Sequence, residues 1–315
     1  MNLLEICKDA KRIGISGHIR PDGDCVGSCL ALYLYLSKYL PRAQVRVFLE
    51  QPADTFNEIK GFEDIDSSFA EQEPFDVYFA LDCSADRLGG AEDYFAGAAK
   101  KINIDHHISN KGSGALNVVR PEVGSVCEVL YDLMDVEKLD KDIAMALYIG
   151  IIHDTGVFQY SNTRPETLQI AAHLITFGFD FPRLIEETFY QKNYIQTQIM
   201  GRALMESIRF MDGSCIVSAV DKKTMEFYNA TSKDLDGIVN QLRNIKGVHC
   251  AIFMYETDVL EYKVSLRSDE MVDVAKVASY FGGGGHMRAA GCTMKGTFHD
   301  CVNNLSLHIA KQLEG

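Results

Sequence analysis

Short runs rich in β-branched and aromatic residues alternate with longer helical stretches through the first half of this chain. The β-rich runs cover residues 12–17, 44–49, 76–81, 101–104 and 115–119. Their apolar residues do not alternate cleanly with polar ones, which is typical of strands buried on both faces. Parallel neighbours need a crossover connection, and the helical stretches provide it. We therefore predict an α/β fold with a mostly parallel sheet flanked by helices.

Helix boundaries in this region follow from capping and breaking residues. Residues 25–40 are predicted to form a helix that a proline ends, and residues 142–152 form another. Ser125 and Glu128 have the spacing of a capping box, so a further helix is predicted to begin there. One more is expected after Pro165.

The length of 315 residues allows about two domains. Beyond residue 209, strands are predicted at 214–220, 248–255 and 262–266, and a helix at 273–280. Residues 181–210 are helix-like and charged, without a Gly/Ser-rich linker. We expect a larger α/β domain at residues 1–190, a helical linker at 191–208 and a smaller α/β domain at 209–315.

Composition restricts the compartment and the partners. No run reaches the ~18 apolar residues of a membrane span, and the first residues lack the pattern of a signal peptide. The nine cysteines are odd in number and include no Cys-x-x-Cys pair, which argues against a disulfide framework. We expect a cytoplasmic protein without a membrane partner. The net charge of −13 argues against a broad basic face for duplex DNA, but not against a short phosphorylated ligand.

Acidic and histidine residues stand where predicted strands and one helix end. They are His18, Asp22 and Asp24 after the first strand, Asp82 after the third, Asp105, His106 and His107 after the fourth, and Asp154 after the helix at 142–152. Ligands of open parallel sheets bind at the carboxyl ends of the strands, so we expect these motifs to converge on one rim. Crowded carboxylates raise one another's pKa unless a positive charge compensates. One or two divalent cations would supply that charge.

The ligand types indicate the chemistry. Carboxylate oxygens with imidazole nitrogens suit Mn²⁺, Fe²⁺, Co²⁺ or Zn²⁺ and need no thiolate. Two such ions about 3.5–4 Å apart can activate a water and clamp a phosphoryl oxygen, which predicts hydrolysis of a phosphoester or phosphoanhydride. We interpret Cys25, Cys29 and Cys83 as small buried residues beside the site, with metal ligation as the alternative.

Each residue also has an ordinary structural explanation when it is taken alone. His18 could be a hydrogen-bonded core histidine, and Asp22 and Asp24 could be turn or cap residues. Asp82 could cap a helix. The metal interpretation depends on the set of residues rather than on any single one.

Two motifs resemble a known family. Asp105-His106-His107, together with the upstream His-x-x-x-Asp-x-Asp pattern at 18–24, resembles the DHH phosphoesterase superfamily, which includes RecJ-like exonucleases and family II inorganic pyrophosphatases. The segment Gly282–Gly291 (GGGGHMRAAG) resembles the signature of the DHH-associated substrate domain. The resemblance spans essentially the whole chain. Its compact second domain is similar to the branch of nano-RNases and 3′-phosphoadenosine 5′-phosphate phosphatases.

The resemblance implies two divalent ions, with Mn²⁺ as the first choice, and a role for each motif residue. His18 and Asp22 would bind one ion, Asp24, His106 and Asp154 the other, and Asp82 would bridge both. His107 would face the scissile phosphate as electrophile or proton donor, and Asp105 would orient a ligand imidazole. The backbone of Gly283, Gly284 and Gly285, together with His286, would hold the phosphate of a terminal nucleotide.

Four further residues carry two interpretations each. Arg267 and Arg288 are candidate phosphate contacts, because a guanidinium offers two-pronged recognition; ordinary surface charge is the alternative. His153 either tunes the second ion or only packs, and Arg164 is either a phosphate contact or a solvated charge.

The function that the resemblance implies is hydrolysis of very short oligonucleotides to nucleoside 5′-monophosphates, and of 3′-phosphoadenosine 5′-phosphate to AMP. The expected partners are short single-stranded oligonucleotides and small nucleotides. Linear or cyclic di-adenylate, polyphosphate and pyrophosphate stay open as substrates, and so does a non-catalytic nucleotide sensor. The sequence leaves the oligomeric state open, with a homodimer among the options.

Overall fold

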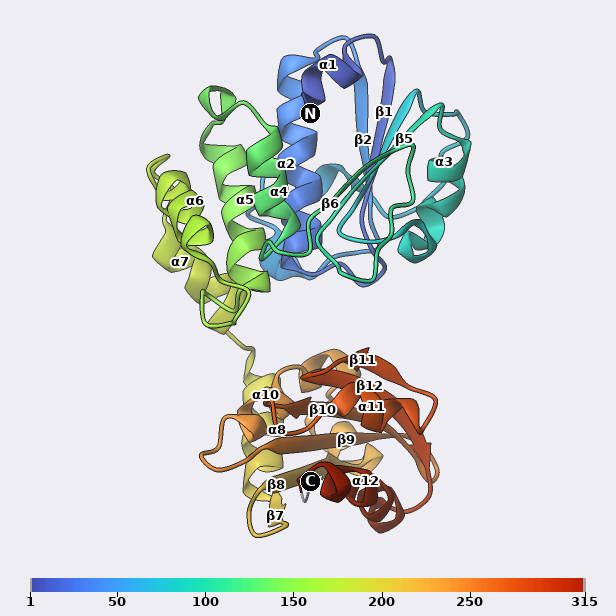
Figure 1. The fold of residues 1–315 in the computed structure, drawn as a ribbon, viewed down its shortest axis with the longest axis vertical. Coiled ribbons are helices and arrows are strands. Elements are labelled where there is room, and N and C mark those ends of the chain that lie inside the picture. The colour runs from blue at the N-terminus through green and yellow to red at the C-terminus, as the bar shows by residue number, and fades with distance from the viewer. Residues whose placement is uncertain (1, 314–315) are drawn as a thin grey trace. The chain divides into compact units, whose positions relative to one another are not determined.

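The structure, a computed structural model, describes residues 2–313 and divides into two units, one ending at Gln191 and the other beginning at Lys192 (Figure 1). Each unit contains one six-stranded sheet with helices on both faces. Within the described residues, no helix has the length and apolar character needed to cross a membrane.

The sheet of the first unit is parallel throughout its described strands and has the order β3-β2-β1-β4-β5-β6. Its strands are β1 (Arg12–Ser16), β2 (Gln44–Phe48), β3 (Ile65–Asp66), β4 (Val77–Leu81), β5 (Lys100–Asp105) and β6 (Leu116–Val119). The predicted fold class is confirmed, and the five predicted strands are present. The two-residue β3 was not predicted, because so short a strand leaves no recognisable run.

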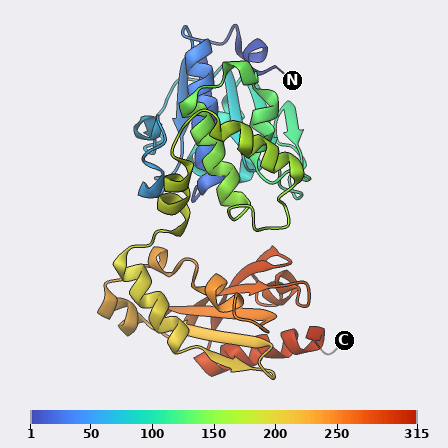
Figure 2. The ribbon, with the colours of Figure 1, turned by 90° about the vertical axis from the view of Figure 1, so that its left-hand side faces the viewer.

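Helices cover both faces of this sheet. They are α1 (Leu3–Cys7), α2 (Gly23–Tyr39), α3 (Glu92–Gly97), α4 (Val126–Leu133), α5 (Lys141–Asp154), α6 (Pro165–Ile175) and α7 (Phe181–Ile185). α2, α4 and α5 lie on one side of the sheet and α3 on the other, and Figure 2 views the unit from the side of α5 and α6. Neighbouring strand residues therefore enter different cores: Phe79 packs on the α2 side and Tyr78 on the α3 side.

The second unit has a mixed sheet of order β11-β12-β10-β9-β8-β7, in which β8 and β9 are parallel and the other described pairs are antiparallel. Its strands are β7 (Ile208–Phe210), β8 (Cys215–Val220), β9 (Cys250–Asp258), β10 (Glu261–Ser268), β11 (Gly284–His286) and β12 (Ala289–Lys295). Its helices are α8 (Tyr194–Met205), α9 (Lys222–Tyr228), α10 (Ile238–Arg243), α11 (Val274–Ser279) and α12 (Phe298–Leu313). One core lies under α8 and α10, and a second lies under α11 and α12.

The segment expected to be a linker contains the helix α8. Its Ile199 and Ala203 are buried in the core under α8 and α10, together with Ile216 of β8 and Phe253 of β9. This segment therefore lies within the second unit and supplies part of its core.

Candidate metal centre and active site

The strand order of the first unit reverses between β1 and β4, and ligands of open sheets bind at such a switch point. His18 follows β1 by two residues, Asp82 directly follows β4, and Asp105 ends β5. These three strands are neighbours in the sheet, so their carboxyl ends lie on one edge. Local folding thus delivers three of the predicted motifs to the same place.

The predicted ligands form three groups, in each of which one ligand atom per residue lies within 4.8 Å of the others. The groups are His18, Asp22 and Asp82; Asp24, His106 and Asp154; and Asp82, Asp105, His106 and His107. Asp82 lies between the two imidazoles: its Oδ2 is 3.4 Å from His18 Nε2, and its Oδ1 is 3.5 Å from His106 Nε2. One carboxylate therefore offers an oxygen to each side of the site.

Two buried atoms of this site lack hydrogen-bond partners. Asp82 Oδ1 and His106 Nε2 are buried without one, although Asp154 Oδ2 lies 3.0 Å from His106 Nε2. Leaving a buried polar atom unpaired costs free energy, and Asp82 also adopts a left-handed backbone conformation with φ of 60°. Strain and unpaired polar atoms are typical of functional positions. A cation would satisfy both atoms, and this oxygen and nitrogen donor set fits a divalent metal.

The charges of the site are balanced only in part by its own imidazoles. Burial alone would lower the pKa of His18, but the carboxylates of Asp22 and Asp82, 3.6 and 3.4 Å from its Nε2, raise that pKa to about 12. Burial likewise opposes charge on His106, whereas Asp154 and Asp82 raise the pKa of this imidazole to about 12. Burial raises the pKa of Asp154 to about 6. Protons and a metal ion would therefore compete for the same atoms.

Both predicted ligand imidazoles are oriented by a backbone carbonyl. Nδ1 of His18 lies 2.8 Å from the Ile19 oxygen, and Nδ1 of His106 lies 3.3 Å from the Val123 oxygen. A carbonyl only accepts, so each Nδ1 must donate. Each Nε2 is then left for the carboxylates of the site, or for a cation between them.

Asp22 and Asp24 cap helices and also belong to the site. Asp22 is the N-cap of α2, and its Oδ1 accepts from the Cys25 amide at 3.1 Å. Asp24 is fully buried, and its two oxygens accept from the amides of Val126 and Cys127 in the first turn of α4. Burial, with the charges of Asp82 and Asp154 nearby, raises the pKa of Asp24 well above its usual range. The cap interpretation of these residues and their place among the ligand groups are thus compatible.

Asp105 contacts a different imidazole from the one expected. The family resemblance implies that it orients a metal-ligand imidazole, but its Oδ1 accepts from Nδ1 of His107 at 2.8 Å. The same oxygen accepts from the backbone amide of His106, whose ring is held by Val123 instead. The hydrogen bond with Asp105 raises the pKa of His107. Asp105 therefore holds the half-buried ring that is predicted to be a proton donor.

The remaining residues with two interpretations pack against their neighbours. The His153 ring lies between Phe56 and Phe189, and its Nε2 is 3.1 Å from Thr188 Oγ1. Burial lowers the pKa of His153 to about 4, so this imidazole is neutral and belongs to the packed interior. Arg164 is ion-paired rather than only solvated, since its Nη2 lies 3.2 Å from a carboxylate oxygen of the buried Glu128.

The cysteines stand apart from the candidate metal groups. All nine are free thiols, and all are buried. Within residues 2–313, none of them belongs to a candidate metal group. This supports the interpretation of Cys25, Cys29 and Cys83 as small buried residues.

The predicted substrate-binding residues lie on one end of the second sheet. Gly284–His286 forms the edge strand β11, and Arg267 lies on β10. The register places His286 opposite Ala289, and Ala289 opposite Arg267, so these side chains share one face of the sheet. Arg288 lies in the turn between β11 and β12, and its Nη2 is 3.4 Å from Glu270 Oε2.

The glycines of this segment differ in what they require. A Cβ on Gly283 would lie 2.2 Å from the Gly291 carbonyl oxygen, and one on Gly285 would lie 2.4 Å from that of Ala289. No atom lies within 4 Å of a Cβ built on Gly284. Close pairing with β12 therefore leaves no room for a side chain at Gly283 or Gly285, whereas Gly284 has room for one.

Sequence reasoning missed several polar residues that support the site. Asn103 is fully buried within β5 and donates to the carbonyls of Ala80 and Cys83, which flank Asp82. Asn110 donates to Asp105 Oδ2 at 2.5 Å. Asn103 was detectable, because an asparagine inside an apolar strand needs a buried partner. Asn110 also donates to Asn103 Oδ1, so both of these partners lie on β5, the strand that precedes its own loop.

Comparison with known proteins agrees with this geometry. Residues 12–151 match the N-terminal domain of the DHH family, and residues 212–314 match the DHHA1 domain. A protein of Thermus thermophilus named bifunctional oligoribonuclease and PAP phosphatase NrnA is 30% identical over 90% of this chain and 84% of its own. The Bacillus subtilis protein of the same name is 26% identical over 88% of this chain and 87% of its own.

Solved structures show the same fold. An exopolyphosphatase-related protein from Bacteroides fragilis superposes with a TM-score of 0.89 at 26% identity, covering 98% of this chain and 95% of its own. RecJ from Thermus thermophilus, in complex with Mn²⁺, shares the fold with a TM-score of 0.57 at 14% identity over 98% of this chain and 54% of its own. The chain therefore belongs to the DHH family and is a metal-dependent hydrolase of phosphoester bonds with a DHHA1 domain as its second unit.

Proposed function

We propose that this protein hydrolyses very short single-stranded oligonucleotides to nucleoside 5′-monophosphates, and 3′-phosphoadenosine 5′-phosphate to AMP. The observation that carries the proposal is the complete ligand set around Asp82, on a chain 30% identical to a protein named for both activities. A nucleotide sensor derived from such an enzyme would be expected to have lost ligands. Here every predicted ligand position has a carboxylate or an imidazole side chain.

Two divalent cations, with Mn²⁺ as the first choice, complete the proposed site. His18, Asp22 and Asp82 would hold one ion, and Asp24, His106 and Asp154 would hold the other together with Asp82. When bound, such ions lower the pKa of a water towards neutrality and neutralise charge on the phosphoryl oxygens. The unpaired Asp82 Oδ1 and His106 Nε2 support this assignment, since each needs a partner.

His107 is the proposed proton donor or electrophile towards the phosphate. Its Nδ1 is occupied by Asp105, so its Nε2–H remains available for an oxygen of the substrate. The carboxylate of Asp105 favours the protonated imidazole, which a donor requires. The half-buried position of His107 leaves part of the ring accessible, in contrast to the buried His18.

The second unit is the proposed substrate-binding domain. His286 and Arg267, which share a sheet face on either side of the small Ala289, would contact the phosphate of a terminal nucleotide. The backbone of Gly283, Gly284 and Gly285 would line the same place, because a chain without side chains allows close approach of a ligand. Arg288 would add a weaker contact, since it is exposed and lies near Glu270.

A substrate panel tests the proposal. The full chain with added Mn²⁺ would be incubated with RNA dimers to pentamers, 3′-phosphoadenosine 5′-phosphate, linear and cyclic di-adenylate, tripolyphosphate and pyrophosphate, and the products separated by chromatography. We expect rapid release of 5′-monophosphates from the short RNAs and of AMP from 3′-phosphoadenosine 5′-phosphate. Turnover confined to the polyphosphates or to cyclic di-adenylate would contradict the proposed substrate class.

A further inference from the structure

A single peptide group connects the imidazole of His106 to a buried carboxylate. The carbonyl oxygen of Val123 lies 3.3 Å from His106 Nδ1, and the amide of the next residue, Gly124, donates to Glu128 Oε1 at 3.1 Å. Both groups belong to the same peptide unit. A hydrogen bond at each end polarises the peptide, so the negative charge of Glu128 strengthens the bond that holds the ring.

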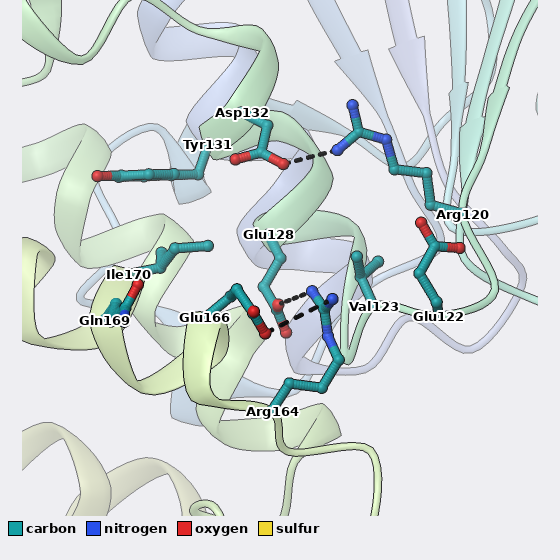
Figure 3. A pocket seen from close by; sticks show the side chains of 10 residues that line it. All are labelled: Arg120, Glu122, Val123, Glu128, Tyr131, Asp132, Arg164, Glu166, Gln169 and Ile170. Atoms are coloured by element: carbon teal, nitrogen blue, oxygen red, sulfur yellow. Dashed lines mark hydrogen bonds and ion pairs between the residues drawn. The ribbon is translucent and has the colours of Figure 1, made fainter.

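Glu128 is fixed on its other side as well. It is 1% exposed, and its Oε2 accepts from Thr167 Oγ1 at 3.0 Å and from Arg164 Nη2 at 3.2 Å. Figure 3 shows the guanidinium of Arg164 paired with both Glu128 and Glu166. These side chains and Val123 line a pocket of about 380 Å³. Burial raises the pKa of Glu128, and the hydrogen bonds from Thr167 and Arg164 act against that rise.

The capping box predicted for α4 explains why this role escapes sequence reasoning. Ser125 is the N-cap and accepts from the Glu128 amide at 3.2 Å, as the spacing predicts. The Glu128 side chain, however, accepts from Gly124, one residue before the cap. A Cβ on Gly124 would lie 2.6 Å from Glu128 Oε1, so the glycine is needed for this close approach.

A second side chain ties the same loop to another predicted ligand. Nδ2 of Asn162 donates to the Gly124 carbonyl and to the Asp154 carbonyl, each at 3.1 Å. The reversed amide would place its oxygen against two carbonyl oxygens, so this orientation is fixed. The Val123–Gly124 loop is therefore anchored to Glu128 through its amide and to the end of α5 through Asn162.

We propose that Glu128 is a positioning residue of the metal centre, which orients His106 through the Val123–Gly124 peptide and so sets the metal affinity of this imidazole. A ligand histidine is commonly oriented by a carboxylate or a carbonyl on its second nitrogen; here a peptide group links the two in series. The inference rests on the proposed metal site and adds a residue that contacts neither the ions nor the substrate.

Glu166 provides a matched control, because its Oε2 also lies beside Arg164, 3.8 Å from Nη1, but its side chain is exposed. Within the described part of the chain, no hydrogen bond joins Glu166 to Gly124 or His106. Mn²⁺ affinity of the metal-free full chain would be measured by titration calorimetry for Glu128→Ala, Glu128→Gln, Glu166→Ala and Glu166→Gln. We expect Glu128→Ala to weaken one Mn²⁺ site by about 10–100-fold. Glu128→Gln should weaken it less, because its amide oxygen can still accept from Gly124. Both Glu166 variants should stay within about twofold of the wild type.

A measurement on the wild-type chain does not depend on whether a variant folds. In the Zn²⁺-loaded protein with ¹⁵N-labelled histidine, we expect the His106 proton on Nδ1 and slow exchange of that proton with water. A His106 without a proton on Nδ1 would contradict the proposed orientation of His106 by Glu128 through the Val123–Gly124 peptide. Equal Mn²⁺ affinities for Glu128→Ala and Glu166→Ala would also contradict it. If the wild-type chain binds no metal, the proposed metal centre is wrong, and the proposed role of Glu128 is wrong with it.

Discussion

His107 and Asp105 form the residue pair whose contact most directly links geometry to acid–base chemistry. Asp105 is fully buried and holds Nδ1 of His107 at 2.8 Å, which raises the pKa of the imidazole. A group with a raised pKa stays protonated to higher pH, and its function as a donor is lost as the pH rises through that value. The alkaline limb of the activity profile would then report His107.

Asp105→Asn removes the charge but keeps the shape. The pKa of His107 should fall, so the alkaline limb of kcat against pH should move to lower pH. The measurement is a pH–rate profile at saturating Mn²⁺ and substrate. His107→Asn should remove this limb altogether, whereas an unchanged limb in Asp105→Asn would exclude the assigned role.

Gly23 and His153, which are far apart in the sequence, form a second close contact. A Cβ on Gly23, in the first turn of α2, would lie 2.2 Å from His153 Cγ. The neutral imidazole is wedged against Phe56 and Phe189, so it has little room to move. The absence of a side chain at residue 23 lets the end of α5 approach the start of α2, where the predicted ligands Asp22 and Asp154 stand.

Gly23→Ala should therefore destabilise the first unit by about 1–3 kcal/mol through overpacking. His153→Ala should cost free energy on its own account, because it leaves a cavity. In the double variant the two losses should be less than additive, because His153→Ala removes the ring atoms that lie 2.2 and 2.7 Å from the new Cβ, although the His153 Cβ at 2.5 Å remains. Urea unfolding of the four proteins measures the coupling, and strictly additive losses would show that the contact is not tight.

At the scale of elements, the predicted ligands were accessible from sequence because each follows a strand or ends a helix. Asp82 and Asp105 could be placed by the ends of apolar runs alone. The supporting residues could not, because the fold alone brings the Val123 carbonyl to His106 and the Asn162 amide to Gly124. The capping-box spacing of Ser125 and Glu128 already explained Glu128 as a capping residue, so no further role was predicted for it.

The second sheet was predicted only in its centre. β8, β9 and β10 have apolar runs, whereas β11 and β12 consist largely of glycine, alanine and other small residues. Such residues have weak strand preference, so these two strands are ordered by pairing: β12 pairs with β10, and β11 pairs with β12. The segment that contains α8 was predicted to be a linker because it belongs to the charged, helix-like stretch 181–210. The buried face of α8 becomes visible only against β8 and β9.

Ile199 on α8 tests the position of this helix. Its side chain is fully buried, so Ile199→Ala should destabilise the second unit by about 2–5 kcal/mol. Since the residue lies in the core of the second unit, Mn²⁺ binding by the first unit should be retained. Ile208→Ala is the matched control, because Ile208 is 55% exposed and should change stability by less than about 0.5 kcal/mol. Equal losses in the two variants, by denaturant unfolding, would place α8 outside the core.

At the scale of the whole molecule, part of the negative net charge is concentrated in the candidate metal site. The net charge of −13 includes Asp22, Asp24, Asp82 and Asp154, which the fold gathers in one site. The imidazoles of that site hold protons tightly when no metal is bound, with pKa values raised to about 12 for His18 and His106. Each ion must therefore displace an imidazole proton, as metal ligands in general must be deprotonated.

This competition predicts a steep pH dependence of metal binding. A group with a raised pKa is protonated throughout the neutral range, so metal affinity should increase as the pH rises. One displaced proton per ion corresponds to about a tenfold gain in affinity per pH unit. Mn²⁺ titrations of the full chain between about pH 6 and about pH 8 measure the slope. A flat profile would mean that the imidazoles are not ligands.

The most direct test of the metal centre is the number of Mn²⁺ ions that the full chain binds at equilibrium, counted with the wild type and with Asp82→Asn side by side. The predicted result is two ions per wild-type chain and weaker binding of both by at least about 100-fold in Asp82→Asn, since this carboxylate lies between the two imidazoles. A folded wild-type chain that binds no Mn²⁺, or an Asp82→Asn chain that binds both ions as tightly, would contradict the account.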